Sequence, residues 1–329
     1  MNYLRQWGFG ALLVLATVSV EAAGKTYISF GSCPVGCTSY TWTAGIADLL
    51  NRKIDGIEAV AEGTKGYIDN ARLLSKGDLQ VAMATTASAV DAYNGRGAFK
   101  GVKPGRMVSW MSIASTYTHV ISLEDSGISS FADLKGKNVG MGQPGGTSLI
   151  DTEALMATFG LTEGKDFKPF KVRLGPMIDG LTDGNIDAVI WAGSIPLGPV
   201  IKLTATHKMK LLEFSDAEVK ALQAEHPAFY RVTIPAGTYK GVDSGVRTYG
   251  NGNAMTIDAE MPEALVYEMT KVIMTNLKDL GKVHPALAKM SKDTVLKGFS
   301  VPLHPGALRY YREIGVPGVE EFAAKFPSK

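Results

Sequence analysis

The sequence predicts an α/β protein of two lobes, each a mixed sheet covered by helices. Three observations lead to this prediction. Short runs of β-forming residues alternate with helical patterns, a strand followed by a glycine-bearing loop and a helix occurs twice, and 45% of the 329 residues are hydrophobic, which is enough for two cores. With 20% charged residues, the composition is that of an ordinary globular protein.

The first 22 residues have the pattern of an export signal. Arg5 supplies positive charge, residues 10–20 form an apolar stretch too short to span a bilayer, and Ala22 provides a small residue at the exit. We expect cleavage after Ala22, because cleavage after Ala23 would place Glu21 at a position that favours small residues. No other apolar run reaches about 18 residues, so the sequence predicts a soluble exported protein.

The first strand, loop and helix follow this signal. Residues 27–30 are rich in β-formers, and Gly31 ends this run. Residues 38–53 carry Trp42 and Ile46 at helical spacing with further apolar residues, which predicts a helix. The same reasoning predicts strands at 58–61 and 79–84 and a helix at 67–76.

A second unit of this kind is centred on the glycine-rich turn at residues 140–148. Residues 107–123 predict one or two strands, 139–141 a short strand, and 149–159 a helix. A turn at a helix start exposes backbone N–H groups at the positive end of the helix dipole, so it can hold an anion. The spacing is not G-x-G-x-x-G, and an ordinary turn stays open as the alternative. We interpret the two units as equivalent positions in two similar lobes.

The remaining elements follow from the same patterns. We expect strands at 187–191 and 210–214, and crossing segments or loops between the lobes at 233–239 and 249–253. The C-terminal part is expected to be mainly helical, with helices at 264–280, 285–290 and 308–311.

Charge and motif content exclude several function classes. The net charge is +2 at pH 7 and no dense run of Lys or Arg is present, so neither nucleic acid nor a membrane surface is an expected partner. No G-x-S-x-G motif and no cysteine–histidine arrangement stands out, so we expect neither an enzyme nor a cofactor.

Cys33 and Cys37 are the only cysteines, in a compartment that permits oxidation. A local disulfide and a pair of free thiols both remain open. Zinc usually takes four ligands and the five histidines are scattered, so we expect no metal site.

Several loops at the carboxyl ends of strands are expected to face one cleft. Their small, hydroxylic and aromatic residues suit a small polar ligand whose carboxylate is held by N–H and hydroxyl groups. We favour a place in the core for Trp42, whereas core and cleft both stay open for Tyr40 and Trp191. The candidate ligand-binding residues are Cys33, Gly36, Ser39, Tyr40, Thr85, Thr86, Gly145, Gly146, Thr147, Ser148 and Trp191.

A series of ordered motifs resembles the solute-binding proteins of tripartite ATP-independent periplasmic (TRAP) transporters, specifically the TAXI group. The motifs are the runs at residues 31–43, 125–128, 133–137, 142–148, 184–188, 234–241 and 302–307. The resemblance implies a two-lobed, type II-like periplasmic binding protein fold with a cleft between the lobes. It implies a monomer that closes on a small organic anion and delivers it to a TRAP membrane permease. We expect lobe 1 to comprise residues 24–123 plus 240–329, and lobe 2 to comprise 124–239.

Departures from the family pattern bear on the ligand. The acidic residue that follows the third strand in the family falls on Ala87 here, which removes a partner for a substrate ammonium. Ser39 replaces the first of two paired tyrosines, whereas Tyr40 is kept. We therefore expect a carboxylate without an α-amino group, such as a keto or hydroxy acid or a dicarboxylate. The alternatives are amino acid binding of the glutamate or glutamine type, a sensory subunit for a membrane receptor, and a periplasmic enzyme on the same fold.

Overall fold

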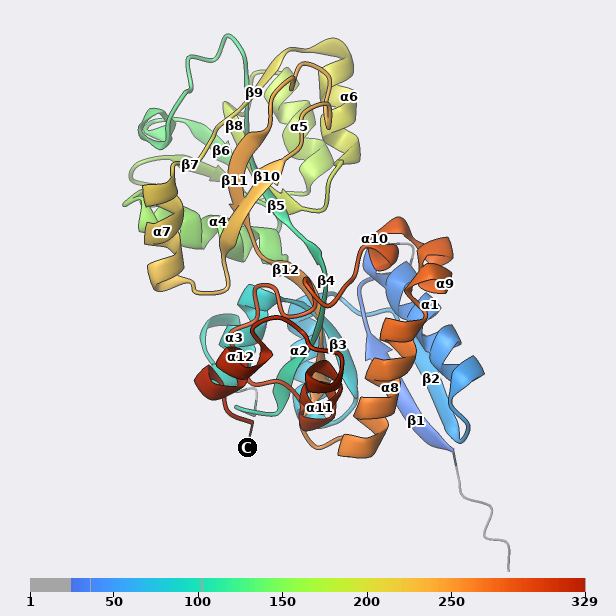
Figure 1. The fold of residues 1–329 in the computed structure, drawn as a ribbon. Helices are drawn as coiled ribbons and strands as arrows, with labels where there is room; N and C mark the ends of the chain where they lie inside the picture. The colour runs from blue at the N-terminus through green and yellow to red at the C-terminus, as the bar shows by residue number, and fades with distance from the viewer. Residues whose placement is uncertain (1–24, 36, 102, 329) are drawn as a thin grey trace, which may run out of the picture.

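The computed structural model describes residues 25–35, 37–101 and 103–328. The predicted export signal, residues 1–22, and the candidate residue Gly36 lie outside the described residues. The described chain forms two lobes joined by a narrow waist (Figure 1). Within these ranges, no helix combines the length and the apolar character needed to cross a membrane.

Each lobe is built on a five-stranded mixed sheet. The strands of the first sheet are β1 (Thr26–Gly31), β2 (Ile57–Glu62), β3 (Val81–Thr85), β4 (Met107–Ser115) and β12 (Gly252–Asp258). Those of the second are β5 (Tyr117–Leu123), β6 (Asn138–Gly140), β7 (Lys168–Phe170), β8 (Ala188–Gly193) and β9 (Met209–Leu211). A separate antiparallel pair consists of β10 (Tyr230–Ile234) and β11 (Val246–Gly250).

The two sheets have equivalent strand orders, β2-β1-β3-β12-β4 and β7-β6-β8-β5-β9. β1 and β6 each lie between two parallel neighbours, and β12 and β5 each run antiparallel to both of theirs. The two strand–loop–helix units predicted from the sequence therefore start from corresponding strands, which confirms their equivalence.

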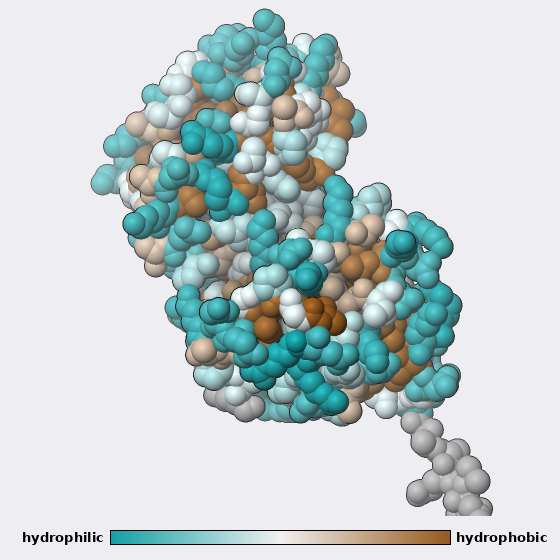
Figure 2. Space-filling model, viewed as in Figure 1, coloured by the Kyte–Doolittle hydropathy of each residue, from teal (hydrophilic) through white to brown (hydrophobic). Residues whose placement is uncertain are grey.

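Helices cover both sheets. The first lobe carries α1 (Thr38–Lys53), α2 (Tyr67–Lys76), α3 (Thr86–Asn94), α8 (Glu263–Thr275), α9 (Leu277–Val283), α10 (Pro285–Ala288), α11 (Pro305–Glu313) and α12 (Val319–Lys325). The second carries α4 (Thr147–Thr158), α5 (Leu174–Thr182), α6 (Gly198–Thr206) and α7 (Asp216–Glu225). On the face shown in Figure 2, most surface residues of both lobes are hydrophilic, with smaller hydrophobic patches between them.

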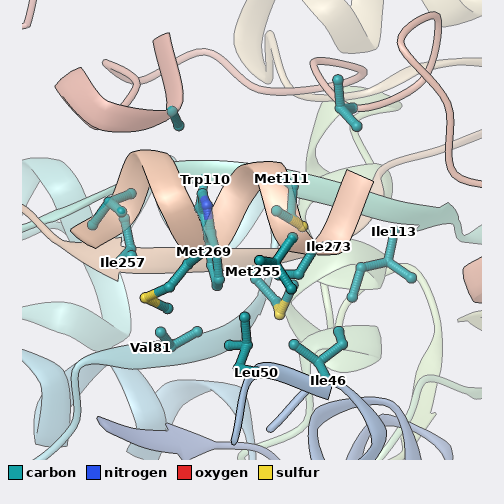
Figure 3. Packing of buried hydrophobic residues seen from close by; sticks show 14 of the residues in the cluster. Ile46, Leu50, Val81, Trp110, Met111, Ile113, Met255, Ile257, Met269 and Ile273 are labelled. Carbon is teal, nitrogen blue, oxygen red and sulfur yellow. The ribbon is translucent and has the colours of Figure 1, made fainter. Parts of the chain in front are cut away.

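The core of the first lobe lies between its sheet and the helices α1 and α8 (Figure 3). Trp110 of β4 is fully buried there, and its indole N–H donates to Thr270 Oγ1 at 2.8 Å. Met255 of β12 and Ile46 of α1 are buried in the same cluster. Each such side chain contributes about 1.5–3 kcal/mol by leaving water, so this core holds α1 firmly against the sheet.

Two short segments cross between the lobes and contact each other. Thr116 joins β4 to β5, and Asn251 joins β11 to β12. The backbone N–H of Thr116 donates to the carbonyl of Asn251 at 2.7 Å, and the N–H of Asn251 donates to Thr116 Oγ1 at 3.0 Å. A Cβ on Gly250 would lie 1.9 Å from the carbonyl oxygen of Thr116, so only glycine allows this close approach.

The observed structure differs from three expectations that were based on the sequence. Strand β5 pairs with β8 and β9 in the second sheet, so the chain changes sheets at Thr116 and not after residue 123. Residues 249–253 do cross between the lobes, but they belong largely to the strands β11 and β12, which we had not expected. The expected helix 264–280 is two helices, because the side chain of Asn276 donates to the Val272 carbonyl at 2.7 Å where α8 ends.

Candidate ligand-binding cleft

A cleft of about 660 Å³ opens between the two lobes, at the carboxyl ends of strands from both sheets. This is the edge at which the sequence predicted the ligand loops to meet. The first lobe supplies residues near β1 and the start of α2, and the second supplies the turn before α4 and the end of β8. Of the candidate ligand-binding residues, those that line it are Cys33, Thr85, Gly145, Gly146, Thr147 and Trp191.

The wall of the second lobe is the glycine-rich turn and the first turn of α4. Gly142 has a φ of +94°, and a Cβ there would lie 3.0 Å from the backbone nitrogen of Leu149, so the turn requires glycine. Gly146 is the N-cap of α4 and has no side chain, so no side-chain acceptor caps the first N–H groups of the helix, and Gly146 and Thr147 line the cleft. The positive end of the helix dipole lies at the same place. This wall can therefore hold an anionic group.

Three candidate hydroxyl groups are held by the protein itself and do not line the cleft. The Oγ of Ser148 accepts from the backbone N–H of Ala192 at 3.0 Å. The Oγ1 of Thr86 accepts from the N–H of Gly252 at 2.8 Å. Ser39 is buried with its hydroxyl 2.6 Å from that of Tyr67. All three side chains therefore bond to groups of the protein that lie around the cleft, and none of them lines it.

The wall of the first lobe combines a disulfide with cationic side chains. Cys33 and Cys37 are disulfide-bonded, and Sγ of Cys37 accepts from the backbone N–H of Tyr40 as the N-cap of α1. Lys65, just before α2, and Arg72, within it, line the cleft with exposed side chains. The half-buried carboxylate of Asp69 lines the same wall, and the guanidinium group of Arg72 donates to the Ala98 carbonyl at 3.0 Å. The half-buried Tyr40 is not among the lining residues.

The aromatic candidates divide as follows. Trp191 lines the cleft and also packs against the core of the second lobe, so it has both of the roles that the sequence left open. Trp42 is 1% exposed and packs edge-on against His284, in the core position that we favoured. Thr85 lines the cleft, but its hydroxyl also accepts from the N–H of Ser88 and caps α3.

Two polar side chains that the sequence analysis missed bridge the mouth of the cleft. Asn253 lies at the start of β12 in the first lobe, and its Nδ2 donates to Ser194 Oγ of the second lobe at 3.2 Å. Its Oδ1 accepts from the hydroxyl of Tyr67 at 3.3 Å. Burial raises the pKa of Tyr67, so this hydroxyl stays protonated and is available as a donor.

The most informative residue that the sequence analysis missed is Asp151, on the inner side of α4. It is 4% exposed, lines the cleft, and accepts from Asn251 Nδ2 at 2.9 Å. Burial, and to a lesser extent the nearby carboxylate of Asp91, raises its pKa to about 7. The sequence carried one indication of this position: Asp151 is four residues before Leu155, which belongs to the apolar set of the predicted helix, so the two lie on the same side.

The described residues contain no group of three or more His, Cys, Asp or Glu side chains placed to hold a metal ion. The lining residues of the cleft offer recognition by charge, backbone N–H groups and hydroxyl groups. One wall carries N–H donors, the other carries two cations and one carboxylate, and the carboxyl group of Asp151 is buried.

A family model described as the NMT1-like family matches residues 30–315 of the chain. Among solved structures, the chain is similar to XAC2383 from Xanthomonas citri bound to ATP, with a TM-score of 0.53 and 12% identity over 92% of this chain and 99% of that chain. XAC2383 bound to chloride ion is similar with a TM-score of 0.54 and 12% identity, over 91% and 99%.

A further similarity is to the alkanesulfonate-binding protein SsuA from Xanthomonas axonopodis pv. citri bound to MOPS. The TM-score is 0.43 at 16% identity, over 93% of this chain and 86% of that chain. At these identities the likenesses concern the fold and not the ligand. The fold is the two-lobed, type II-like binding-protein fold that the sequence predicted.

Proposed function

The chain belongs to the NMT1-like family, and we propose that it is an exported solute-binding protein that captures a small organic anion and delivers it to a TRAP-type membrane permease. In this proposal the protein works in the periplasm as a monomer, and it makes and breaks no bond in its ligand. The permease couples transport to an ion gradient, which supplies the energy.

The observation that carries this proposal is the charge distribution across the cleft. The first turn of α4 presents the backbone N–H group of Thr147, and the opposite lobe presents the cations Lys65 and Arg72 beside one carboxylate, Asp69. The N–H of Gly146 donates to the Gln143 carbonyl at 3.1 Å. An anion between the two walls contacts both lobes only when they are close together. Binding then stabilises the closed arrangement, because the ligand has a higher affinity for it than for an open one.

The TRAP and TAXI assignments depend on the ordered sequence motifs. In the motif at 142–148, residues 143–147 line the cleft. The sensory alternative uses the same closed form to dock on a receptor. Gene neighbourhood separates the two proposals, since a gene for a large fused permease beside this one indicates the transporter.

A thermal-shift screen of small carboxylates on refolded, ligand-free protein tests the anion proposal. We expect at least one acid to raise the melting temperature, as a ligand does when it binds only the folded state. Incubation with that acid should return it unchanged, and a turnover product would support the enzyme alternative.

A pair of variants tests whether the cationic wall is the site. The Lys65→Gln, Arg72→Gln double variant should bind the acid about tenfold more weakly than the unaltered protein, because two attractive charges are lost. The matched control is Lys208→Gln, an exposed lysine outside the cleft that pairs with Glu124. Equal affinities in all three proteins would contradict the proposed site.

The expected preference for an acid without an α-amino group stays a prediction, because it depends on Ala87 alone. Asp151 favours the amino acid alternative, since a buried carboxyl group that lines the cleft can receive an ammonium group. The two alternatives differ in one chemical group of the ligand and can be compared directly.

A further inference from the structure

A second, smaller cavity of about 260 Å³ lies beside the cleft. The two share the lining residues Thr85, Thr147 and Asp151, so the smaller cavity is a side compartment that adjoins the cleft. Its lining residues Arg96, Gly97 and Glu225 are exposed, so the side compartment also opens to solvent. Helix α3 of the first lobe, helix α4 of the second and the segment after α7 form its walls. A ligand that enters this compartment therefore contacts both lobes.

The charged groups that line the side compartment are mainly acidic. Its acidic lining residues are Asp91, Asp151 and Glu225, against one arginine, Arg96, which already pairs with Asp91 at 3.5 Å. His226 completes the charged and titratable groups of the lining. The rest of the wall is largely apolar, with Val90, Ile150, Ala154 and Phe229 among its residues. A positively charged group is therefore favoured in the side compartment, whereas in the cleft the cations Lys65 and Arg72 lie beside the carboxylate of Asp69.

Asp151 lies where the two compartments meet. Only 4% of its surface is exposed, and its Oδ2 accepts from Asn251 Nδ2 at 2.9 Å. No hydrogen bond donor among the described residues reaches Oδ1 of Asp151. A buried carboxylate is stable only with a charged or hydrogen-bonding partner, and without one it is driven toward the neutral form. The raised pKa of Asp151 agrees with a carboxyl group that lacks a cation in the ligand-free protein.

We infer that Asp151 receives the ammonium group of a zwitterionic ligand whose anionic group lies at the first turn of α4. The ligand class is accordingly an amino acid or another acid that carries an amine. This inference rests on the proposed function of the cleft and names the substrate class of that same site.

The spacing along α4 suits such a ligand. Thr147 and Asp151 are four residues apart, so they lie on the same side of the helix and about 6 Å apart along its axis. The same helix therefore presents its positive N-terminal end to one end of a small molecule and a carboxyl group to the other.

The position of Ala87 supports this assignment. Ala87 lines the same side compartment as Asp151, from α3 on the opposite lobe. The preference for an acid without an α-amino group depended on the absence of a carboxyl group at residue 87. In the tertiary structure, Asp151 supplies a carboxyl group to the same compartment from the other lobe. An ammonium group therefore has a partner even without an acidic residue at position 87.

Matched ligand pairs test the inference. The ligand-free protein is titrated by calorimetry with proteinogenic amino acids and with the 2-oxo and 2-hydroxy acids that have the same side chains. We expect the best amino acid to bind at least about tenfold more tightly than its 2-oxo and 2-hydroxy counterparts, because only the amino acid pairs with Asp151.

Two variants place this preference at Asp151. Asp151→Asn keeps the size of the side chain and removes its negative charge. It should lower the affinity for amino acids by at least about tenfold, and it should change the affinity for 2-oxo or 2-hydroxy acids by less than about twofold. Glu153→Gln removes a charge two residues away that faces Lys171 on the outer surface, and it should leave all affinities unchanged.

The outcomes distinguish this inference from the proposed function. Binding of a 2-oxo or 2-hydroxy acid with no preference for its amino counterpart in the unaltered protein overturns the role of Asp151 and supports the anion site. Amino acid binding that is the same in the Asp151→Asn and Glu153→Gln proteins also overturns it. A failure of every acid to bind overturns the proposed function as well.

Discussion

The two strand–loop–helix units, β1 with α1 and β6 with α4, occupy corresponding places in sheets of the same strand order, yet their loops differ in what they offer the cleft. The first loop is closed by the Cys33–Cys37 disulfide, and the nearby hydroxyl of Ser39 is taken up by Tyr67. The second is a glycine turn that leaves the N-terminal end of α4 open to the cleft. Topology therefore decides where a loop lies, whereas its residues decide whether it has groups free to bind.

Removing the disulfide tests whether the first loop has a bracing role, that is, whether it stabilises the fold without binding the ligand. The Cys33→Ser, Cys37→Ser double variant should lose about 2 kcal/mol of unfolding free energy, as expected for a short loop closed by a disulfide. Ligand affinity should fall less, because the anion-binding groups lie mainly on the other wall. The measurement is denaturant unfolding with and without reductant.

The double variant is its own control, since reductant should destabilise only the unaltered protein. If reductant changes neither the melting temperature nor the ligand affinity of the unaltered protein, the bracing role is wrong.

Substitutions of two neighbouring hydroxyl residues of α4 test which of them is directed at the cleft. Ser148→Ala leaves the N–H of Ala192 without its acceptor, so we expect a loss of about 1.5 kcal/mol of unfolding free energy. Thr147→Val changes a side chain that lines the cleft, so it should leave stability within about 0.5 kcal/mol and lower anion affinity.

Denaturant unfolding and calorimetry on both variants separate these effects. The reverse pattern, in which Ser148→Ala weakens only binding and Thr147→Val weakens only stability, would show that Ser148 contacts the ligand as the sequence predicted.

The contact between Asn253 and Ser194 joins the two walls. Ser194→Ala removes this hydrogen bond and leaves Asn253 bonded to Tyr67, so the closed arrangement should lose about 1 kcal/mol. Small-angle scattering of the ligand-free protein should show a larger radius of gyration. Ser244→Ala, at an exposed serine outside the cleft, is the matched control and should show no change.

Much of the fold follows from short stretches of sequence. The helices at residues 38–53 and 67–76 coincide with α1 and α2, because an apolar stripe at helical spacing and local end signals are contained within each segment. The glycine turn before α4 is also local, since Gly142 allows a backbone angle that other residues rarely adopt. In these regions the information and the structure lie within the same few residues.

The cleft itself is less local. Cys33, Thr85, Thr147 and Trp191 were predicted to meet, and the structure brings them to one cavity because they all follow strands at the same sheet edges. Ser39, Thr86 and Ser148 belong to the same loops, but their hydroxyl groups turn to protein partners. Sequence patterns identify the loops, and they do not say which way each side chain points.

The sequence alone therefore predicts the alternation of strands and helices, the two-lobed class and the glycine turn before α4, since these depend on periodicity and backbone preference within single segments. Three features needed the tertiary structure: the crossing at Thr116 and Asn251, the strands β11 and β12, and the placement of Asp151. Each depends on hydrogen bonds or burial between residues far apart in the chain. No local pattern records which distant residue will be the partner.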